Sequence, residues 1–455
     1  MGIMVDSTPK LKRFLRHAPL KDMTLYLIMR VVIVFMDHPG RMSCSQASCA
    51  VAVLPVHKAQ ICRFLGRPRW RSLGINDVYR NVLLKREAAS KGRFLLVIDG
   101  TAVTQQGKHT QNTSHYGNRT RRPQRKKRYG RNKSAQKNSH LFTFALLITP
   151  SGVRIPFQRP FYTKAYCQAH GRDHCSTAES AAELIDQLPL PPGADVVVLG
   201  DTAYDARVVQ DACARRHYLW IVPCNSERVL AGPQGARPQV RSLLKEWSRY
   251  RLTTVRFVPC RGKYAGYRRL SRSRIGPKVK ARTFYVHQET RQVRSVGKVL
   301  LVFSTKDSQL SQATPDNVKI LMTNATHLSV SEIVELYTLR WQIELFFKEL
   351  KSTLGFHQYK FKTFEAVEGW AELAVTTVLY LEWYRAEQLQ KCTTKEAAES
   401  WWQHQRLHGI CQAIRSCTKE ADLQYIAERI ETDGGTRKLK RLLRNRIPAE
   451  YRSSP

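Results

Sequence analysis

Four polar side chains recur at helical spacing between Ser329 and Gly355, and together they suit chemistry on a phosphate group. They are Tyr337, Arg340, Glu344 and Lys351. At about 100° per residue, all four fall within a sector of about 60° on one predicted long helix. Apolar residues fill the neighbouring sector, which places the four at the edge of a buried face. Charged groups avoid such an edge unless they are paired, so this arrangement indicates a functional site.

Helical geometry separates Glu344 from the other acids of this segment. Glu335 and Glu349 project about 180° from the four polar side chains, or nearly so, and are predicted to lie on a solvated face. Glu344 is predicted to lie at the edge of the buried face, where a metal site would be held in place and would exclude water. Taken alone, Glu344 can also be an ordinary ion-pair partner of Arg340 or Lys348 at helical spacing.

Two aspartates supply the partners that Glu344 would need. Asp99 follows the apolar run Phe94–Ile98, and Asp201 follows the apolar run Val196–Leu199, as expected at the ends of buried strands. Carboxylates from two strands and a helix can converge at one sheet edge, where hard oxygen ligands bind Mg²⁺ or Mn²⁺. Two such ions, about 3.5–4 Å apart, would activate a water or a 3′-hydroxyl and stabilise the leaving oxygen of a phosphodiester. The three acids are therefore the predicted catalytic and metal-binding residues.

Each aspartate also has a purely structural interpretation. An aspartate after a strand is commonly a turn or capping residue, and Asp99 is followed by Gly-Thr. Asp201 could cap a helix that begins near Ala206, a role for which Asp205 competes. The occurrence of all three acids in one strongly basic chain favours the catalytic interpretation.

The elements that must position these acids form a mixed α/β pattern. Three successive strands are predicted first, and helices then alternate with strands. In chain order they are the strands Phe94–Ile98, His140–Thr149 and Val153–Phe157, the helix Thr177–Leu188, the strand Val196–Leu199, the helix Ala206–Arg216 and the strand Tyr218–Val222. A β-rich insertion before the Glu344 helix contains three more strands, Thr253–Val258, Thr283–Gln288 and Val299–Ser304. The predicted fold is a mixed sheet flanked by helices, with this insertion.

Five regions follow from these patterns. Residues 1–90 form a helical N-terminal region that is a candidate DNA-binding module, and residues 91–224 form the first part of a catalytic core. Residues 225–320 form the β-rich insertion, and residues 321–390 form the helical second part of the core. Residues 391–455 are predicted to be a basic helical C-terminal region.

The charge balance points to a polyanionic partner. The 455 residues include 75 Lys and Arg against 36 Asp and Glu, giving a net charge of +39. DNA or RNA is the default partner of such a chain, and an anionic membrane fits less well because the basic residues are spread along the sequence. The apolar segment Thr24–Met36 is too short to span a bilayer and carries Arg30, so a buried helix in a cytoplasmic protein is expected.

Cysteine usage favours reduced thiols over a disulfide framework. The 11 cysteines are an odd number and follow no repeating pattern. Cys224 follows a strand and is expected to be a buried thiol. Cys167, His170, His174 and Cys175 have zinc-like spacing, but they crowd into one short segment, so a His-rich loop is the favoured interpretation.

A basic segment, Asn118–Asn138, contains ten Lys or Arg residues between the first two predicted strands. Its place beside Asp99 favours contact with DNA phosphates, which would be strongly dependent on salt. A solvated charge run without a specific role is the alternative.

The polar residues of the long helix resemble the signature of the insertion-sequence-four family of DDE transposases, with the spacing Tyr337-x2-Arg340-x3-Glu344-x6-Lys351. Asp99 in VIDGT and Asp201 in LGDTAYD resemble that family's first and second catalytic aspartates. The resemblance extends over about residues 90–385. It implies an RNase H-like fold with the β-rich insertion between the second aspartate and the glutamate.

This resemblance implies a role for each residue. The three acids would hold two Mg²⁺ ions, for which Mn²⁺ would substitute. Tyr337, Arg340 and Lys351 would contact DNA phosphates near the cleaved end of the element. Trp341 could stack on an unpaired base, although a partly buried core aromatic is an equally good interpretation.

The implied function is that of a bacterial-type insertion-sequence transposase. Such an enzyme binds double-stranded DNA at the inverted terminal repeats of its element, cleaves it and transfers the freed strands to target DNA. Pairing of two ends implies a homodimer in the synaptic complex. Two alternatives stay open: another RNase H-like metal-dependent nuclease or resolvase, and a catalytically silent DNA-binding derivative. The intact context of all three acids argues against the silent derivative.

Overall fold

The computed structural model describes residues 9–36, 44, 56–87, 92–105, 107, 109–116, 137–191, 193–232, 237–259, 267–269, 282–391, 394 and 413–414. The chain divides into two compact units. The first contains Met1–Tyr79, Ser352–Tyr359 and Glu365–Pro455, and the second contains Arg80–Lys351 and Lys360–Phe364. Most of the basic segment 118–138 and of the predicted helical region 391–455 lies outside the described residues.

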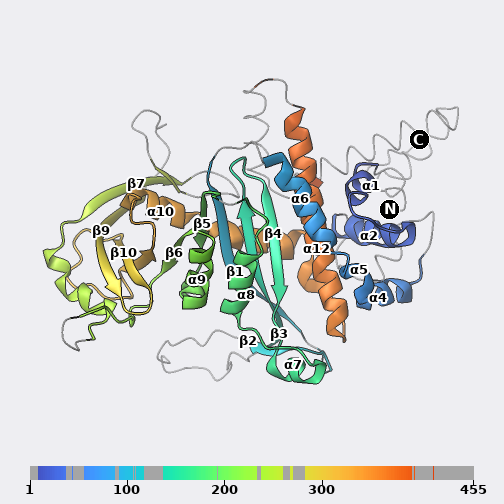
Figure 1. Ribbon diagram of the computed structural model, residues 1–455, viewed down its shortest axis with the longest axis horizontal. Coiled ribbons are helices and arrows are strands. Elements are labelled where there is room, and N and C mark those ends of the chain that lie inside the picture. Colours follow the sequence, from blue (N-terminus) through green and yellow to red (C-terminus); the bar gives the residue numbers. More distant parts are fainter. Residues whose placement is uncertain are drawn as a thin grey trace, which may run out of the picture. The chain divides into compact units, whose positions relative to one another are not determined.

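One mixed sheet of eleven strands dominates the second unit (Figure 1). Its first three long strands, β1 (Phe94–Thr104), β3 (Lys137–Ile148) and β4 (Arg154–Pro160), form an antiparallel meander. β5 (Val196–Leu199) pairs in parallel with β1, and β6 (Leu219–Pro223) pairs in parallel with β5. The predicted meander, followed by alternating strands and helices, is confirmed.

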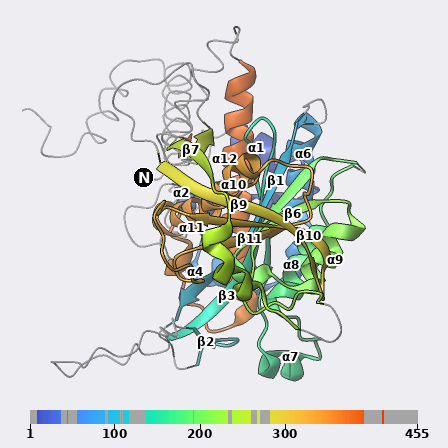
Figure 2. The same cartoon turned by 90° about the vertical axis from the view of Figure 1, so that its left-hand side faces the viewer.

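Helices cover both faces of this sheet. α8 (Thr177–Asp186) and α9 (Arg207–Arg215) lie on one face, and the helix that carries Glu344, α11 (Trp341–Lys348), lies on the other (Figures 1 and 2). A third helix, α7 (Lys164–His170), precedes α8. All four residues of β5 are buried as a result. This two-sided burial explains why β5 is a continuous apolar run without the alternation of a half-exposed strand.

The strands of the predicted insertion extend the same sheet and form no separate one. The predicted strands are present as β7 (Thr253–Pro259), β9 (Arg282–Val293) and β10 (Gly297–Thr305). β11 (Lys319–Thr323), which the sequence analysis did not predict, pairs antiparallel with both β6 and β10 and so joins the two parts. The short strands β2 (Ser114–Tyr116) and β8 (Tyr267–Arg269) and the 3-10 helix η2 (Val240–Arg249) were also not predicted.

The prediction of one long helix from Ser329 to Gly355 is wrong. The segment consists of α10 (Val330–Thr338), α11 (Trp341–Lys348) and the π-helical turn η3 (Glu349–Thr353). Between α10 and α11 the backbone bonds shorten to three-residue steps, with the Arg340 N–H donating to the Tyr337 carbonyl at 3.1 Å. No Gly or Pro lies within these elements to signal the break. Long-range contacts of the side chains, described below, accompany it.

The predicted solvation of Glu349 is also wrong, and Glu335 is only half-buried. Glu349 is the first residue of the π-helical turn, and 3% of its surface is exposed. Its carboxylate pairs with the guanidinium of Arg154 in β4 at 2.9 Å. A charged group can be buried in this way because its partner is buried with it.

The described part of the first unit is helical. It contains α1 (Pro9–Leu15), α2 (Asp22–Met36), α4 (Lys58–Gly66), α5 (Pro68–Arg71), the start of α6 (Ile75–Glu87) and most of α12 (Phe364–Gln390). Phe14 of α1 stacks on Tyr79 with ring centroids 4.4 Å apart. At Gly369 of α12, a Cβ would lie 2.4 Å from the Leu65 carbonyl oxygen, so only glycine permits this close approach to α4. Of the described helices, including the predicted buried helix α2, none is long and apolar enough to cross a membrane.

Candidate active site

Asp99 and Asp201 lie at the same level of two adjacent parallel strands. The register of β1 and β5 pairs Val97 with Leu199, and each aspartate lies two residues beyond that pair. Residues at one level of neighbouring parallel strands lie side by side, so the two carboxylates are brought to one place. The Asp201 carboxylate is close enough to raise the pKa of Asp99. The two aspartates therefore lie close together as predicted, but only Asp201 follows the end of its strand, because β1 continues through Asp99 to Thr104.

Arg340 connects this edge to Glu344. Its guanidinium donates to Asp99 Oδ2 at 3.3 Å and to Glu344 Oε1 at 2.5 Å. The three side chains are partly buried, with exposed fractions of 17% for Arg340, 19% for Asp99 and 33% for Glu344. The structure thus pairs two of the predicted acids, Asp99 and Glu344, with one predicted cation, and the third acid, Asp201, lies near Asp99.

The carboxylates at this edge are only partly neutralised. Burial and the Asp201 carboxylate raise the pKa of Asp99 to about 6, and Glu344 adds to this effect. The Gly100 N–H, 2.7 Å from Asp99 Oδ1, and the Arg340 guanidinium lower it. The acidic groups outweigh the cation, so further positive charge would stabilise the ionised cluster.

These residues fit a divalent cation by their donor chemistry. Three carboxylates supply the hard oxygen ligands that Mg²⁺ and Mn²⁺ prefer. Among the residues that the structure describes, no group of three or more His, Cys, Asp or Glu side chains is already arranged to hold an ion. Arg340 spans two of the acids, so an ion at Asp99 and Glu344 would share them with this guanidinium or displace it.

Tyr337 lies beside Arg340 in a largely buried position. Its exposed fraction is 9%, and burial raises its pKa to about 12. The phenol is therefore protonated near neutral pH and can donate a hydrogen bond. Its hydroxyl interacts with the Arg340 side chain. The predicted grouping of Tyr337, Arg340 and Glu344 on one side is present despite the break between α10 and α11.

Lys319 is a cation of this site that the sequence analysis missed. It is the first residue of β11, and its Nζ lies 4.6 Å from the centroid of the Tyr337 ring. Partial burial lowers its pKa, as does the positive charge of Arg340, while Glu344 raises it. A single lysine before an apolar run carries no signal of its own. Its role depends on the pairing of β11 with β6, which brings Lys319 to this edge.

Lys351 and Trp341 occupy different surroundings. Lys351 belongs to the π-helical turn and donates from Nζ to the Ala102 carbonyl of β1 at 2.9 Å, three residues beyond Asp99. Burial lowers the pKa of Lys351. Trp341 is 50% exposed, so its interpretation as a partly buried core aromatic is wrong.

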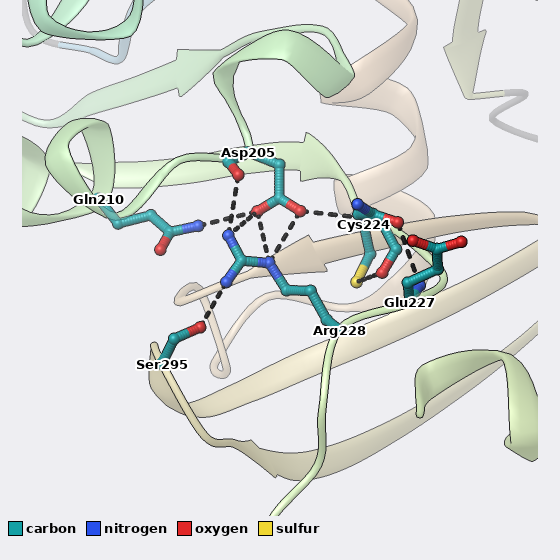
Figure 3. Close-up of polar contacts among 7 residues, drawn as sticks. Asp205, Gln210, Cys224, Glu227, Arg228 and Ser295 are labelled. Carbon is teal, nitrogen blue, oxygen red and sulfur yellow. Dashed lines mark hydrogen bonds and ion pairs between the residues drawn. The ribbon is translucent and has the colours of Figure 1, made fainter. Parts of the chain in front are cut away.

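The structural interpretations of the acids are partly correct. Asp201 caps a turn, but the turn is the short 3-10 helix η1 (Thr202–Tyr204), whose Ala203 N–H donates to Asp201 Oδ1 at 2.9 Å. The helix α9 begins after Ala206 without a side-chain cap. Asp205 pairs instead with Arg228 at 2.7 Å (Figure 3). Glu344 does pair with Arg340 at helical spacing. These local bonds orient the acids and use only some of their oxygen lone pairs.

The segment with zinc-like spacing uses several of its side-chain polar atoms in hydrogen bonds to the backbone. The Nδ1 atoms of His170 and His174 lie 2.9 and 3.0 Å from backbone carbonyl oxygens, and the Cys167 thiol donates to another carbonyl at 3.6 Å. The interpretation as a His-rich loop is only partly correct, because Cys167 and His170 lie in α7 and only His174 and Cys175 lie in the loop that follows. Cys224 is a buried thiol, as expected, and burial raises its pKa to about 12.

A mixed sheet that collects carboxylates at one edge is typical of enzymes that transfer phosphoryl groups with the help of metal ions. Residues 165–380 match the family model described as "Transposase DDE domain". This part of the chain is therefore similar to the transposase DDE domain, the catalytic domain of a family of phosphoryl-transfer enzymes. The sheet and its flanking helices are consistent with an RNase H-like domain of this kind.

This domain implies a transposase, and a transposase binds DNA. Enzymes with the domain generally use divalent metal ions. The matched residues include Asp201, Arg340 and Glu344, and they begin after Asp99. A comparison with curated proteins found no match.

Proposed function

We propose that this protein is the transposase of a bacterial-type insertion sequence of the insertion-sequence-four family. It cleaves double-stranded DNA at the inverted terminal repeats of its element and joins the freed 3′-hydroxyls to target DNA. The observation that carries this proposal is the pairing of Arg340 with Asp99 and Glu344 beside Asp201 at one sheet edge. The spacing of the polar residues on the α10–α11 segment supports the choice of family.

The three acids are the proposed ligands of two Mg²⁺ ions, and Mn²⁺ would substitute. When bound, such ions supply an activated water or 3′-hydroxyl and stabilise the leaving oxygen of the phosphodiester. The raised pKa of Asp99 supports this role, because the crowded carboxylates favour added positive charge. Partial burial fixes the carboxylates and limits access of bulk water.

The cations and the phenol are the proposed phosphate contacts. Arg340 can bind two oxygens of one phosphate through its planar guanidinium. Tyr337 can donate a hydrogen bond from its protonated hydroxyl to a phosphate oxygen. Lys351 supplies a point charge at Ala102 of β1, three residues after Asp99, and Lys319 adds one beside Tyr337. The exposed ring of Trp341 suits stacking on an unpaired base. Pairing of two element ends makes a homodimer the proposed working state.

The experiment uses the full-length protein, Mg²⁺ and a DNA that carries the element's own terminal repeats. Asp99→Ala, Asp201→Ala and Glu344→Ala are compared with the parent for DNA binding, cleavage and strand transfer, after circular dichroism has checked that each is folded. Loss of cleavage and strand transfer in all three, with DNA binding retained, supports the proposal. Cleavage without joining would assign a nuclease or resolvase. Binding without cleavage in the parent would leave only a DNA-binding derivative.

A further inference from the structure

A buried ion pair joins Arg228 to Asp205, four residues after Asp201 in the chain (Figure 3). The Asp205 side chain is 1% exposed, and the Arg228 side chain is 14% exposed. Arg228 Nε donates to both carboxylate oxygens of Asp205, at 3.0 and 2.9 Å. Its Nη2 donates to Asp205 Oδ1 at 2.7 Å and to the Asp205 backbone carbonyl at 2.8 Å. One guanidinium therefore holds both the side chain and the main chain of this aspartate.

Other segments complete the coordination of the same carboxylate. Gln210 of α9 donates from Nε2 to Asp205 Oδ1 at 3.0 Å, and the Asn225 N–H donates to Oδ2 at 3.0 Å. The remaining nitrogen of Arg228, Nη1, donates to Ser295 Oγ at 2.6 Å. Ser295 lies in the turn between β9 and β10. The pair thus ties the loop after β5 to α9, to the loop after β6 and to the strands of the predicted insertion.

Asp205 and Asp201 are the two ends of one short turn. Asp201 caps the start of η1, and Asp205 caps its end with an N–H that donates to the Thr202 carbonyl at 3.3 Å. The turn is tightly packed, because a Cβ at Gly200 would lie 2.9 Å from Tyr204 Cβ. Three residues and the hydrogen bonds at both ends of the turn connect Asp205 to Asp201. A shift of Asp205 is therefore expected to move the Asp201 carboxylate.

We propose that Arg228 is a positioning residue for Asp201. By fixing Asp205 it fixes η1, and through Ser295 it makes the β9–β10 turn part of the support for the active site. This inference rests on the proposed function, because it assumes that Asp201 is a metal ligand. Groups that orient a metal ligand through a second contact commonly change metal affinity or activity by about 10–100-fold when they are removed.

The chemistry of the pair requires arginine. A lysine carries the charge but supplies one ammonium group, which cannot donate to both carboxylate oxygens, the backbone carbonyl and Ser295 in a fixed plane. Arg228→Lys therefore keeps the charge and loses the geometry. Arg228→Met loses both, and Asp205→Asn keeps the shape of the partner but removes its charge.

The test measures binding of Mn²⁺ to the full-length protein by electron paramagnetic resonance, below the unfolding temperature of every variant. We expect Arg228→Met to weaken Mn²⁺ binding by about 10-fold or more, and Arg228→Lys by less. Combining Arg228→Met with Asp205→Asn should add little, because both changes break the same contact. Arg71→Met is the matched control, since Arg71 pairs with Glu368 at 2.6 Å with similar exposed fractions, 17% and 10%, in the other compact unit.

The possible outcomes distinguish a failure of the proposed metal site from a failure of the proposed role of Arg228. Failure of the parent to bind Mn²⁺, or unchanged binding by Asp201→Ala, would overturn the proposed metal site and the inference with it. Loss of binding by Asp201→Ala with parent-like binding by the Arg228 variants would overturn the inference alone. An equal loss in Arg71→Met would also overturn it, because general destabilisation would then explain the effect. If Arg228→Met does not fold, Arg228→Lys decides by the same criteria.

Discussion

Arg154 of β4 and Glu349 of the π-helical turn form an ion pair at 2.9 Å in which the two side chains are only 2% and 4% exposed. Glu349→Ala would leave the buried guanidinium without this carboxylate. The expected loss in the free energy of unfolding is about 3–5 kcal/mol, measured by urea denaturation. Glu335→Ala is the control, because this glutamate is half-buried on α10 and its loss should cost less than about 1 kcal/mol.

The same pair allows a second variant that separates charge from packing. Arg154→Met combined with Glu349→Leu removes both charges and keeps apolar volume, so it should recover most of the stability lost in Glu349→Ala. A double variant that is as unstable as the single one would contradict this account of the buried pair.

Replacing Glu344 should affect chemistry more than folding. Glu344→Gln removes a proposed metal ligand at a position that is one-third exposed, so strand transfer should fall by more than about 100-fold while the unfolding midpoint changes little. Glu335→Gln on α10 should leave strand transfer close to that of the parent. Gel assays on a labelled element end measure strand transfer by the two variants. Equal effects of Glu344→Gln and Glu335→Gln on strand transfer would rule out the assigned role of Glu344.

The stability of the metal-free protein should depend on pH through Asp99. Its pKa is raised from 3.8 to about 6, so the folded state holds this proton more tightly than the unfolded state does. Protonation of Asp99 stabilises the fold fully below about pH 4. This stabilisation, of up to about 3 kcal/mol, is lost as the pH rises through about 6. Asp99→Asn cannot ionise, so its stability relative to the parent should increase from pH 4 to pH 7. Urea denaturation in a chelator gives this difference, and a constant difference would contradict the raised pKa.

Lys319 is expected to add one phosphate contact. Lys319→Met should weaken binding to element ends and should reduce the slope of log affinity against log salt by about 0.9. Lys319→Arg keeps the charge above Tyr337 and should retain the parent slope. Fluorescence anisotropy across a salt series measures the slopes. A parent-like slope in Lys319→Met would show that this lysine neutralises no DNA phosphate.

Trp341 is expected to act on DNA and not on folding. Because half of its surface is exposed, Trp341→Ala should change the unfolding midpoint only slightly. It should weaken binding to an element end with unpaired bases by about 1–3 kcal/mol, as expected when a stacked aromatic is lost. Trp341→Phe should retain most of that affinity. Equal weakening on fully paired DNA would argue against stacking.

The sheet could be predicted from sequence because its strands are short apolar runs that end in polar residues. The apolar run before Asp99 and the one before Asp201 are nearly all buried, and their parallel pairing brings the two acids together. The helical spacing of Tyr337, Arg340 and Glu344 was also informative, because three-residue steps over one turn change their direction only slightly.

What could not be predicted depends on contacts between distant segments. The break at Arg340 accompanies its bond to Asp99, and the burial of Glu349 depends on Arg154, nearly two hundred residues earlier in the chain. Lys319 reaches the site only through the antiparallel pairing of β11 with β6. Periodicity within one segment carries no information on such partners, which is why a helix drawn from sequence alone was too long and too regular.

Asp99 in β1 and Asp201 just after β5 lie at a common level, and this limits how the chain can vary. Successive residues of a strand point to opposite faces and advance by about 3.3 Å, so losing one residue before either aspartate would turn its carboxylate away from the other. The connection from β1 to β5 has no such restriction, because its length does not change the pairing of Val97 with Leu199. Related sequences can therefore differ widely in the distance between the two acids, while the count of residues within each strand must stay constant.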